Sequence, residues 1–174
     1  EAGSRPGTFI SSARSCTIAV TFAGAGLITR TRRNSSTPPP NPKNATATLV
    51  HAILASAGIR AGLVSTVAAD TGAAVRDTGL HVTTPEPEDL QGYLADMRDA
   101  GIEVAVLEVT SHGLAQERVT HVRFDVAAVT NITHEALEFH GTFEAYRRAK
   151  ARLFHLAAIS PGRAGTTKTA VLNV

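Results

Sequence analysis

The chain has 174 residues, which suits one domain and is long enough to bury a sizeable core. A formal net charge of only +2 argues against a nucleic-acid partner or a membrane-surface partner, and no apolar run is long enough to span a bilayer. The lone Cys16 excludes an internal disulfide and is typical of a reducing compartment, so we expect a cytoplasmic protein.

The first 43 residues are the least regular part of the chain. A short strand is expected over 17–20, followed by a basic run at 30–33 and a proline-rich run at 38–42. Because proline removes backbone donors and restricts the residue before it, the proline-rich run is neither helix nor central strand. We expect residues 1–43 to form a poorly defined, flexible segment.

Helices and strands alternate from residue 44 onward. Predicted helices cover 44–59, the stretch from the turn at Thr83-Thr84-Pro85 to Gly101, and 143–156; predicted strands cover 61–67, 104–107, 124–130 and 170–174, with a loop or small hairpin over 68–82. In the first helix we expect an apolar stripe formed by four residues, Leu49, Val50, Ile53 and Leu54. This alternation predicts an α/β fold of βαβ units with a mostly parallel sheet.

Both ends of the chain suggest a longer protein. The sequence starts Glu1-Ala2 with no initiator Met, and it closes on the apolar run 169–174, which begins a strand. We therefore expect a fragment of a longer protein.

Polar residues follow two of the predicted strands where each strand ends. Glu108 ends the run 104–107, and Thr130-Asn131 ends the run 126–129. Ligands of open α/β sheets bind at the carboxyl ends of the strands, so both clusters fall where a site is expected. Glu108 can hold a hard cation such as Mg²⁺, or it can be a capping or salt-bridging carboxylate; position alone does not choose.

The polar loop after Glu108 contains Thr110, Ser111 and His112. A Ser-His pair suggests a nucleophile, but adjacent side chains rarely point at each other and no glycine-flanked elbow is present. Binding of a substrate or phosphate oxygen is the preferred interpretation.

Two further groups of residues leave alternatives open. Four residues resemble metal-ligand spacing, namely His134, Glu135, Glu138 and His140, but without a Cys or a third clear ligand a polar surface loop is the preferred interpretation. Lys150 lies beside an apolar helical stripe, where it can extend to solvent or be buried, modified and catalytic.

Taken in order, the motifs resemble those of the Mur ligase family. They are Thr83-Thr84-Pro85-Glu86, Glu108-Val109-Thr110-Ser111-His112-Gly113-Leu114, Gln116 with Arg118, Arg123-Phe124-Asp125-Val126, Thr130-Asn131-Ile132-Thr133, Phe139-His140-Gly141, and Tyr146 with Ala149-Lys150-Ala151-Arg152-Leu153-Phe154. The resemblance covers 44–174 and is strongest to the branch that adds the third residue to a UDP-N-acetylmuramoyl dipeptide.

The resemblance implies the central, ATP-binding domain of an amide-forming ligase of peptidoglycan synthesis, with a three-layer fold like that of P-loop nucleoside triphosphatases. Such ligases use ATP and Mg²⁺ to phosphorylate the carboxylate of a UDP-N-acetylmuramoyl peptide, and an amino acid then attacks the acyl phosphate. The implied roles are Mg²⁺ binding by Glu108, a carbamylated Lys150 that helps bind a second Mg²⁺, nucleotide binding at Lys43, Asn44 and Asn131, and substrate binding by Thr83, Thr84, Ser111, Gln116 and Arg118.

The sequence departs from the family pattern at two places. Where the family has a Gly-Thr-Asn-Gly-Lys-Thr phosphate loop, this chain has Pro39-Pro40-Asn41-Pro42-Lys43-Asn44, so both glycines are prolines and Asn44 replaces the hydroxyl residue. Proline removes N–H donors that would cradle phosphate and forbids positive φ. Ala136 stands where the family has a metal-binding histidine.

These departures lead to three expectations. We expect an incomplete Mur ligase central domain with little or no ligase activity, because the phosphate loop is degenerate and the flanking ligase domains are missing. A non-catalytic module that binds the UDP-muramoyl peptide is the second interpretation. The third is a decayed or erroneously read gene fragment. The residues do not indicate which amino acid is added or which oligomeric state is formed.

Overall fold

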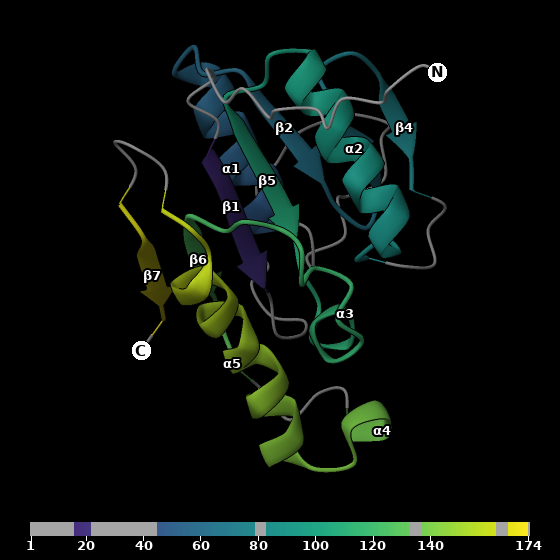
Figure 1. The fold of residues 1–174 in the computed structure, drawn as a ribbon, viewed down its shortest axis with the longest axis vertical. Helices are drawn as coiled ribbons and strands as arrows, with labels where there is room; N and C mark the ends of the chain where they lie inside the picture. Colours follow the sequence, from purple (N-terminus) through teal and green to yellow (C-terminus); the bar gives the residue numbers. More distant parts are fainter. Residues whose placement is uncertain (1–15, 22–44, 79–82, 133–136, 163–166, 174) are drawn as a thin grey trace, which may run out of the picture.

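The computed structural model describes residues 16–21, 45–78, 83–132, 137–162 and 167–173. Its elements are β1 (Cys16–Thr21), α1 (Ala45–Ser56), β2 (Ala61–Val64), β3 (Ala68–Asp70), β4 (Val75–Asp77), α2 (Pro87–Asp99), β5 (Val104–Glu108), α3 (Ser111–Ala115), β6 (Val126–Val129), α4 (Leu137–His140), α5 (Phe143–Ile159) and β7 (Thr169–Leu172). Figure 1 shows their arrangement. Across these ranges, no helix has the length and apolar character needed to cross a bilayer.

A single sheet joins the strands in the order β4-β3-β2-β5-β1-β6-β7. The five strands β2, β5, β1, β6 and β7 pair in parallel, and the short β3 and β4 add an antiparallel hairpin at one edge. Parallel pairing confirms the expected α/β fold, and the hairpin confirms one of the two alternatives for 68–82. β1 also confirms the strand expected over 17–20.

β1 lies in the middle of the sheet although it precedes residue 44, where we expected the domain to begin. Cys16 is level with Val104 of β5, and Thr21 is level with Val129 of β6. The rest of the expected flexible segment, including the basic run and the proline-rich run, lies outside the residues that the structure describes.

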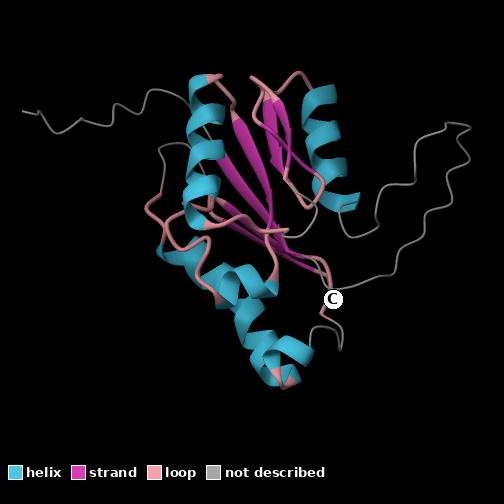
Figure 2. Ribbon diagram, turned by 90° about the vertical axis from the view of Figure 1, so that its right-hand side faces the viewer, coloured by secondary structure: helices cyan, strands magenta, loops and turns pink. Residues whose placement is uncertain are grey.

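Helices lie on both faces of the sheet, which gives three layers, and an apolar cluster fills the contact on each face (Figure 2). On one face, α2 and α5 pack against alternate strand residues such as Val64, Ala105 and Leu107. On the other face, α1 packs against Leu63 and Val106. Successive residues of β2 and β5 thus face opposite helices, which explains why these strands are nearly continuous apolar runs.

The apolar stripe expected on α1 is half wrong. Val50 and Leu54 pack on the sheet, but Leu49 and Ile53 are 59% and 58% exposed. Ala47 is fully buried at the helix–sheet contact, and its small side chain lets the helix approach along a narrow strip. A helix that contacts the sheet along so narrow a strip buries fewer positions than a four-residue stripe requires.

Several predicted boundaries also need correction. The strand expected over 61–67 ends at Val64 because Ser65 N–H donates to the Ala68 carbonyl and turns the chain into the hairpin. The loop expected after Glu108 contains α3, a short helix that begins at its cap Thr110. The last helix continues to Ile159. The final strand covers Thr169–Leu172.

The packing of the core predicts that truncating a buried and an exposed apolar side chain will change the free energy of unfolding by very different amounts. Phe124 is fully buried between the sheet and α5, so Phe124→Ala should lower the free energy of unfolding by about 3–5 kcal/mol. The exposed Ile53 is the control, because Ile53→Ala should change stability by no more than about 0.5 kcal/mol. Urea unfolding of both variants checks this, and equal losses would contradict the assignment of Phe124 to the core.

Candidate functional site

The candidate site lies at the carboxyl edge of the parallel strands. Glu108 at the end of β5 is level with Val20 of β1, and Val64 at the end of β2 is level with Leu107. The arrows of β1 and β5 point toward α3 in Figure 1. Strand ends, the loops that follow them and α3 therefore meet at one edge, where open α/β sheets bind ligands.

Glu108 is a buried carboxylate that accepts hydrogen bonds from Thr66. Only 5% of its surface is exposed. The backbone N–H of Thr66 lies 3.1 Å from Glu108 Oε2, and the Thr66 hydroxyl lies 3.2 Å from the same oxygen. The Thr66 hydroxyl is also 2.9 Å from the hydroxyl of Thr83. A buried charge needs such partners, and a carboxylate among hydroxyl oxygens has the hard donor character that Mg²⁺ prefers.

The turn at Thr83-Thr84 is tied to the start of α3. Thr110 caps the helix by accepting the Gly113 N–H at 3.0 Å, and its own N–H donates to the Thr84 hydroxyl at 2.9 Å. A Cβ at Gly113 would lie 2.7 Å from the Cβ of Thr84. Glycine is therefore required at residue 113 so that the helix can approach the turn.

Arg118 is held by two partners on the same turn. Its Nη1 donates to the Thr84 carbonyl at 2.8 Å, and its Nη2 pairs with Glu86 at 2.9 Å. Only 15% of the Arg118 side chain is exposed, and its buried Nε has no partner among the described residues. Buried polar atoms are nearly always paired in folded proteins, so this unused donor is an exception among the described residues.

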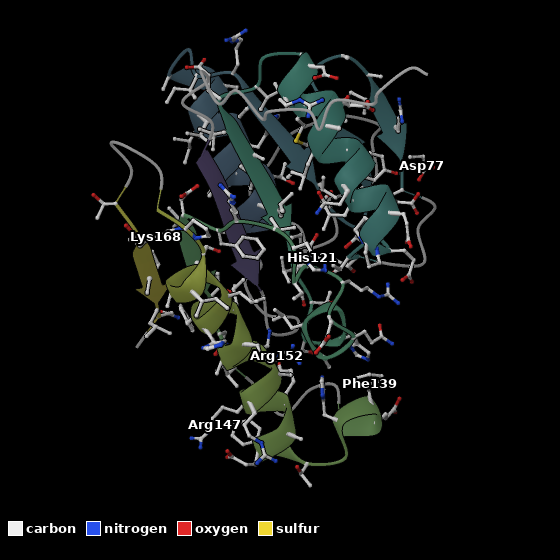
Figure 3. All side chains as sticks on the ribbon, viewed as in Figure 1. Asp77, His121, Phe139, Arg147, Arg152 and Lys168 are labelled. Carbon is white, nitrogen blue, oxygen red and sulfur yellow. The ribbon has the colours of Figure 1, made fainter. Side chains whose placement is uncertain are left out.

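An aromatic cluster closes the same region from the side of α4 and α5. The Phe139 ring, labelled in Figure 3, is tilted by 38° against the His112 ring with centroids 4.0 Å apart. The centroid of the His140 ring lies 5.4 Å from that of His112 and 5.5 Å from that of Tyr146. The His140 Nε2 is buried and has no partner among the described residues. This is a second polar atom whose partner is not supplied by the described chain.

Both histidines of this cluster favour the neutral form. Burial lowers the pKa of His112, and the positive charge of Arg118 lowers it further. Burial also lowers the pKa of His140, with smaller contributions from His112 and Lys150. Desolvation and neighbouring positive charge both disfavour an imidazolium, so the two effects act in the same direction.

Lys150 is buried on α5, with 1% of its surface exposed. Its Nζ lies 5.2 Å from the centroid of the Tyr146 ring, within the range of a cation–π contact. Burial excludes the interpretation in which Lys150 extends to solvent. A buried lysine has the environment in which the amine can be modified or become catalytic.

The structure brings most of the predicted site residues to this edge. Ser111 is buried in the first turn of α3, and Gln116 is exposed at the C-cap of the same helix. Asn131 follows β6, is exposed, and accepts the N–H of Ile132 at 2.8 Å. Lys43 and Asn44 lie outside the described residues, as does Ala136.

The histidine-rich metal hypothesis gains no support. His134 and Glu135 lie outside the described residues, and Glu138 is exposed. Within the parts of the chain that are described, no group of three or more His, Cys, Asp or Glu side chains is placed to hold a metal ion.

Sequence reasoning missed Thr66, and it named Thr110 and Glu86 without predicting that they hold other site residues in place. Thr66 follows a strand end, the same signal that identified Glu108. It was missed because the predicted strand ran on to residue 67 and placed Thr66 inside it.

Glu117 carries backbone strain next to the site. Its φ is 61°, and it follows the C-cap of α3, where glycine is usual. Its carboxylate pairs with Arg152 of α5 at 2.9 Å (Figure 3). The strained turn is thereby tied to the helix that carries Lys150.

The strain at Glu117 predicts the effect of a glycine substitution. Glu117→Gly should raise the free energy of unfolding by about 1 kcal/mol relative to Glu117→Gln, because glycine adopts positive φ without a steric penalty. Both variants lose the exposed ion pair with Arg152, and the glutamine amide keeps at most an exposed hydrogen bond, so their difference comes mainly from the backbone. Urea unfolding measures it, and a glycine variant less stable than the glutamine variant would contradict the strain.

The two histidines predict a pH dependence of stability. Because their pKa values are lowered in the folded chain, the unfolded chain binds more protons between those values and the ordinary value of about 6.5. The free energy of unfolding should therefore rise with pH through this window, be fully developed above it, and fall on acidification.

Urea unfolding at about pH 5 and about pH 7.5 checks this dependence, with the combined His112→Gln and His140→Gln variant expected to lose less stability on acidification. His155→Gln, on the exposed side of α5, is the matched control. Equal losses in the double variant and the wild type would contradict the prediction.

The chain is similar to known proteins along most of its length. A family model described as the Mur ligase middle domain matches residues 41–173. A UDP-N-acetylmuramoyl-L-alanyl-D-glutamate–2,6-diaminopimelate ligase of Pseudomonas syringae pv. tomato is 44% identical over 114 residues, which is 66% of this chain and 23% of that protein. A UDP-N-acetylmuramyl-tripeptide synthetase of Treponema pallidum is 43% identical over 114 residues, 64% of this chain and 21% of that protein.

A solved structure of a UDP-N-acetylmuramoyl-L-alanyl-D-glutamate–2,6-diaminopimelate ligase superposes with a TM-score of 0.66 at 29% identity, covering 92% of this chain and 27% of that one. The chain therefore spans about a quarter of the length of these relatives. The matched family model covers every element from α1 to β7, and thus the edge that carries Glu108, Arg118 and Lys150, but not β1. The resemblance found in the motifs is thus confirmed, and the chain belongs to the Mur ligase family.

Proposed function

We propose that this chain is the ATP-binding central domain of a ligase that builds peptidoglycan precursors in the cytoplasm. The domain comprises 44–174 together with β1 (Cys16–Thr21), which lies in the middle of its sheet, and the segment 1–43 ends in the degenerate phosphate loop. The ligase joins an amino acid to a UDP-N-acetylmuramoyl peptide. Support comes from family membership over 41–173 and from the names of the relatives.

The buried Glu108 is the observation that carries the proposal. A carboxylate that is 5% exposed, held by two donors of Thr66 at the carboxyl end of β5, fits one oxygen ligand of Mg²⁺. Mg²⁺ keeps several waters, so it needs few protein ligands. When bound, it neutralises charge on the transferring phosphoryl group.

The reaction follows from the weakness of a carboxylate as an electrophile. The substrate carboxylate attacks the γ-phosphorus of ATP, which releases ADP and gives an acyl phosphate. The amine of the incoming amino acid then attacks the acyl carbon, loses a proton, and phosphate leaves with the electron pair of the C–O bond. This chain contributes positioning and charge stabilisation to the first step.

Lys150 is proposed to carry a carbamate. The neutral amine attacks CO₂, forms an N–C bond and loses a proton, which converts a cation into a carboxylate. The carbamate is itself a buried anion, so it needs a nearby cation or hydrogen-bond donors to stabilise it. The new carboxylate then helps to hold a second Mg²⁺.

The remaining residues are proposed to bind substrate and nucleotide. Arg118 presents its unused Nε, and Ser111 lies in the adjacent first turn of α3. Substrate binding is assigned to Thr83, Thr84, Ser111, Gln116 and Arg118, and nucleotide binding to Lys43, Asn44 and Asn131. For Thr84 the hydroxyl already contacts Thr110, so its contribution is to hold the turn.

We further propose that this chain by itself has little or no ligase activity. Pro39 and Pro42 stand at the two glycine positions of the phosphate loop, and Ala136 replaces a metal-binding histidine. Proline at those positions removes phosphate-cradling donors.

A non-catalytic module that binds the UDP-muramoyl peptide is the second candidate. This candidate is favoured by the contacts of Thr84 with Thr110 and with Arg118, because they organise the proposed substrate side without the degenerate phosphate loop. Substrate binding without turnover separates this candidate from an active ligase.

A binding and turnover experiment tests these proposals. With Mg²⁺, ATP, the UDP-N-acetylmuramoyl dipeptide and an amino acid, the chain should release no phosphate above background. Calorimetry should detect binding of the dipeptide, and Arg118→Ala should lower the binding affinity by about tenfold or more, because a charge-assisted contact is lost.

Arg147→Ala is the matched control, because Arg147 is exposed on α5 and pairs only locally with Glu144 (Figure 3). Phosphate release that depends on the dipeptide would refute the proposed loss of activity. Wild-type binding that Arg118→Ala leaves unchanged would refute the assigned role of Arg118.

A further inference from the structure

Thr66 links the metal side of the proposed site to its substrate side. It contacts the proposed Mg²⁺ ligand Glu108 through both its N–H and its hydroxyl, and its hydroxyl is 2.9 Å from the proposed substrate residue Thr83. We propose that Thr66 is a positioning residue that fixes the Glu108 carboxylate and couples it to Thr83. This inference rests on the proposed function.

The direction of the hydrogen bonds follows from counting protons. In its ionised form the Glu108 carboxylate only accepts, and the Thr66 hydroxyl has a single proton. The Thr66 hydroxyl is placed as the donor toward both Glu108 Oε2 and the Thr83 hydroxyl, so its single proton is shared between these two acceptors. A change at Thr83 therefore alters the hydrogen bond that Glu108 receives.

The backbone of Thr66 is itself held in place. The Thr78 hydroxyl donates to the Thr66 carbonyl at 2.9 Å and lies 3.1 Å from the Ser65 carbonyl. The Ser65 hydroxyl accepts the N–H of Val67 at 3.3 Å. These contacts prevent the loop after β2 from turning the two donors of Thr66 away from Glu108.

Burial makes the position of Thr66 consequential. Glu108 is almost enclosed, so water cannot readily replace a lost donor, and a hydrogen bond in such surroundings is stronger than in solvent. Two donors on one oxygen fix the plane of the carboxylate. Partners of this kind orient metal ligands, and their removal typically lowers metal affinity by about 10–100-fold.

The test measures Mn²⁺ affinity by calorimetry on the complete chain, with Mn²⁺ as the probe for the Mg²⁺ site. Thr66→Val is nearly isosteric and removes only the hydroxyl, so we expect about tenfold weaker binding, at the low end because the N–H remains. Thr66→Ser should restore the affinity. Thr120→Val, at an exposed position between α3 and β6, is the matched control, and thermal melts of each variant exclude unfolding.

The coupling has its own readout. Thr66→Val should also lower the affinity for the UDP-N-acetylmuramoyl dipeptide. When it is combined with Thr83→Val, the fold-loss of affinity should be smaller than the product of the two single fold-losses. Both substitutions break the same hydrogen-bonded chain, so their effects are not independent. A fold-loss of affinity in the double variant equal to the product of the two single fold-losses would overturn the coupling.

The outcomes separate the two proposals. If wild type binds Mn²⁺ and Glu108→Gln binds it equally well, the metal role of Glu108 is wrong and the proposed function loses its main support. If Glu108→Gln lowers the Mn²⁺ affinity but Thr66→Val does not, only the inference about Thr66 is wrong. If wild type does not bind Mn²⁺, both are overturned.

Discussion

Parallel pairing of β1 with β5 and β6 is the constraint on which the rest of the structure depends. It aligns the carboxyl ends of strands that lie far apart in the sequence and places Glu108 level with Val20. Because successive strand residues face opposite sides, a slip of one residue would exchange the side chains that face α1 with those that face α2 and α5. The register therefore decides at once which residues form the core and which polar groups gather at the edge.

Hydroxyl groups and backbone amides build the polar edge that this register creates. Thr66, Thr84 and Thr110 fill the hydrogen-bonding needs of a buried carboxylate, a turn and a helix start. Such networks are stable only when their members are satisfied, and most of the members at this edge are. The exceptions in the described part of the chain, Arg118 Nε and His140 Nε2, border the proposed substrate position, where unused hydrogen-bonding capacity is expected.

Sequence patterns predicted the order and type of most elements, because periodicity and strand-end polarity report which side chains must be buried. They placed Glu108 and Asn131 after strands and singled out Ser111 and Lys150, and the motif resemblance assigned roles to these residues and to Arg118. They failed for α3, whose five residues are too few to show a period and whose helix depends on the Thr110 cap and on Gly113 fitting against Thr84. Leu49 and Ile53 were also misjudged, because the closeness of the α1 contact depends on the sheet beneath it.

By itself the sequence determined the α/β class, the family and the residue types of the site, since these follow from local pattern and ordered motifs. Only the tertiary structure decided that Lys150 is enclosed, that Thr66 holds Glu108, and that His112 and His140 share one cluster. The Thr66–Glu108 contact joins residues 42 positions apart, and the contact between His112 and His140 joins residues 28 positions apart. Their distances depend on strand register and helix packing, and no local stretch of sequence encodes either.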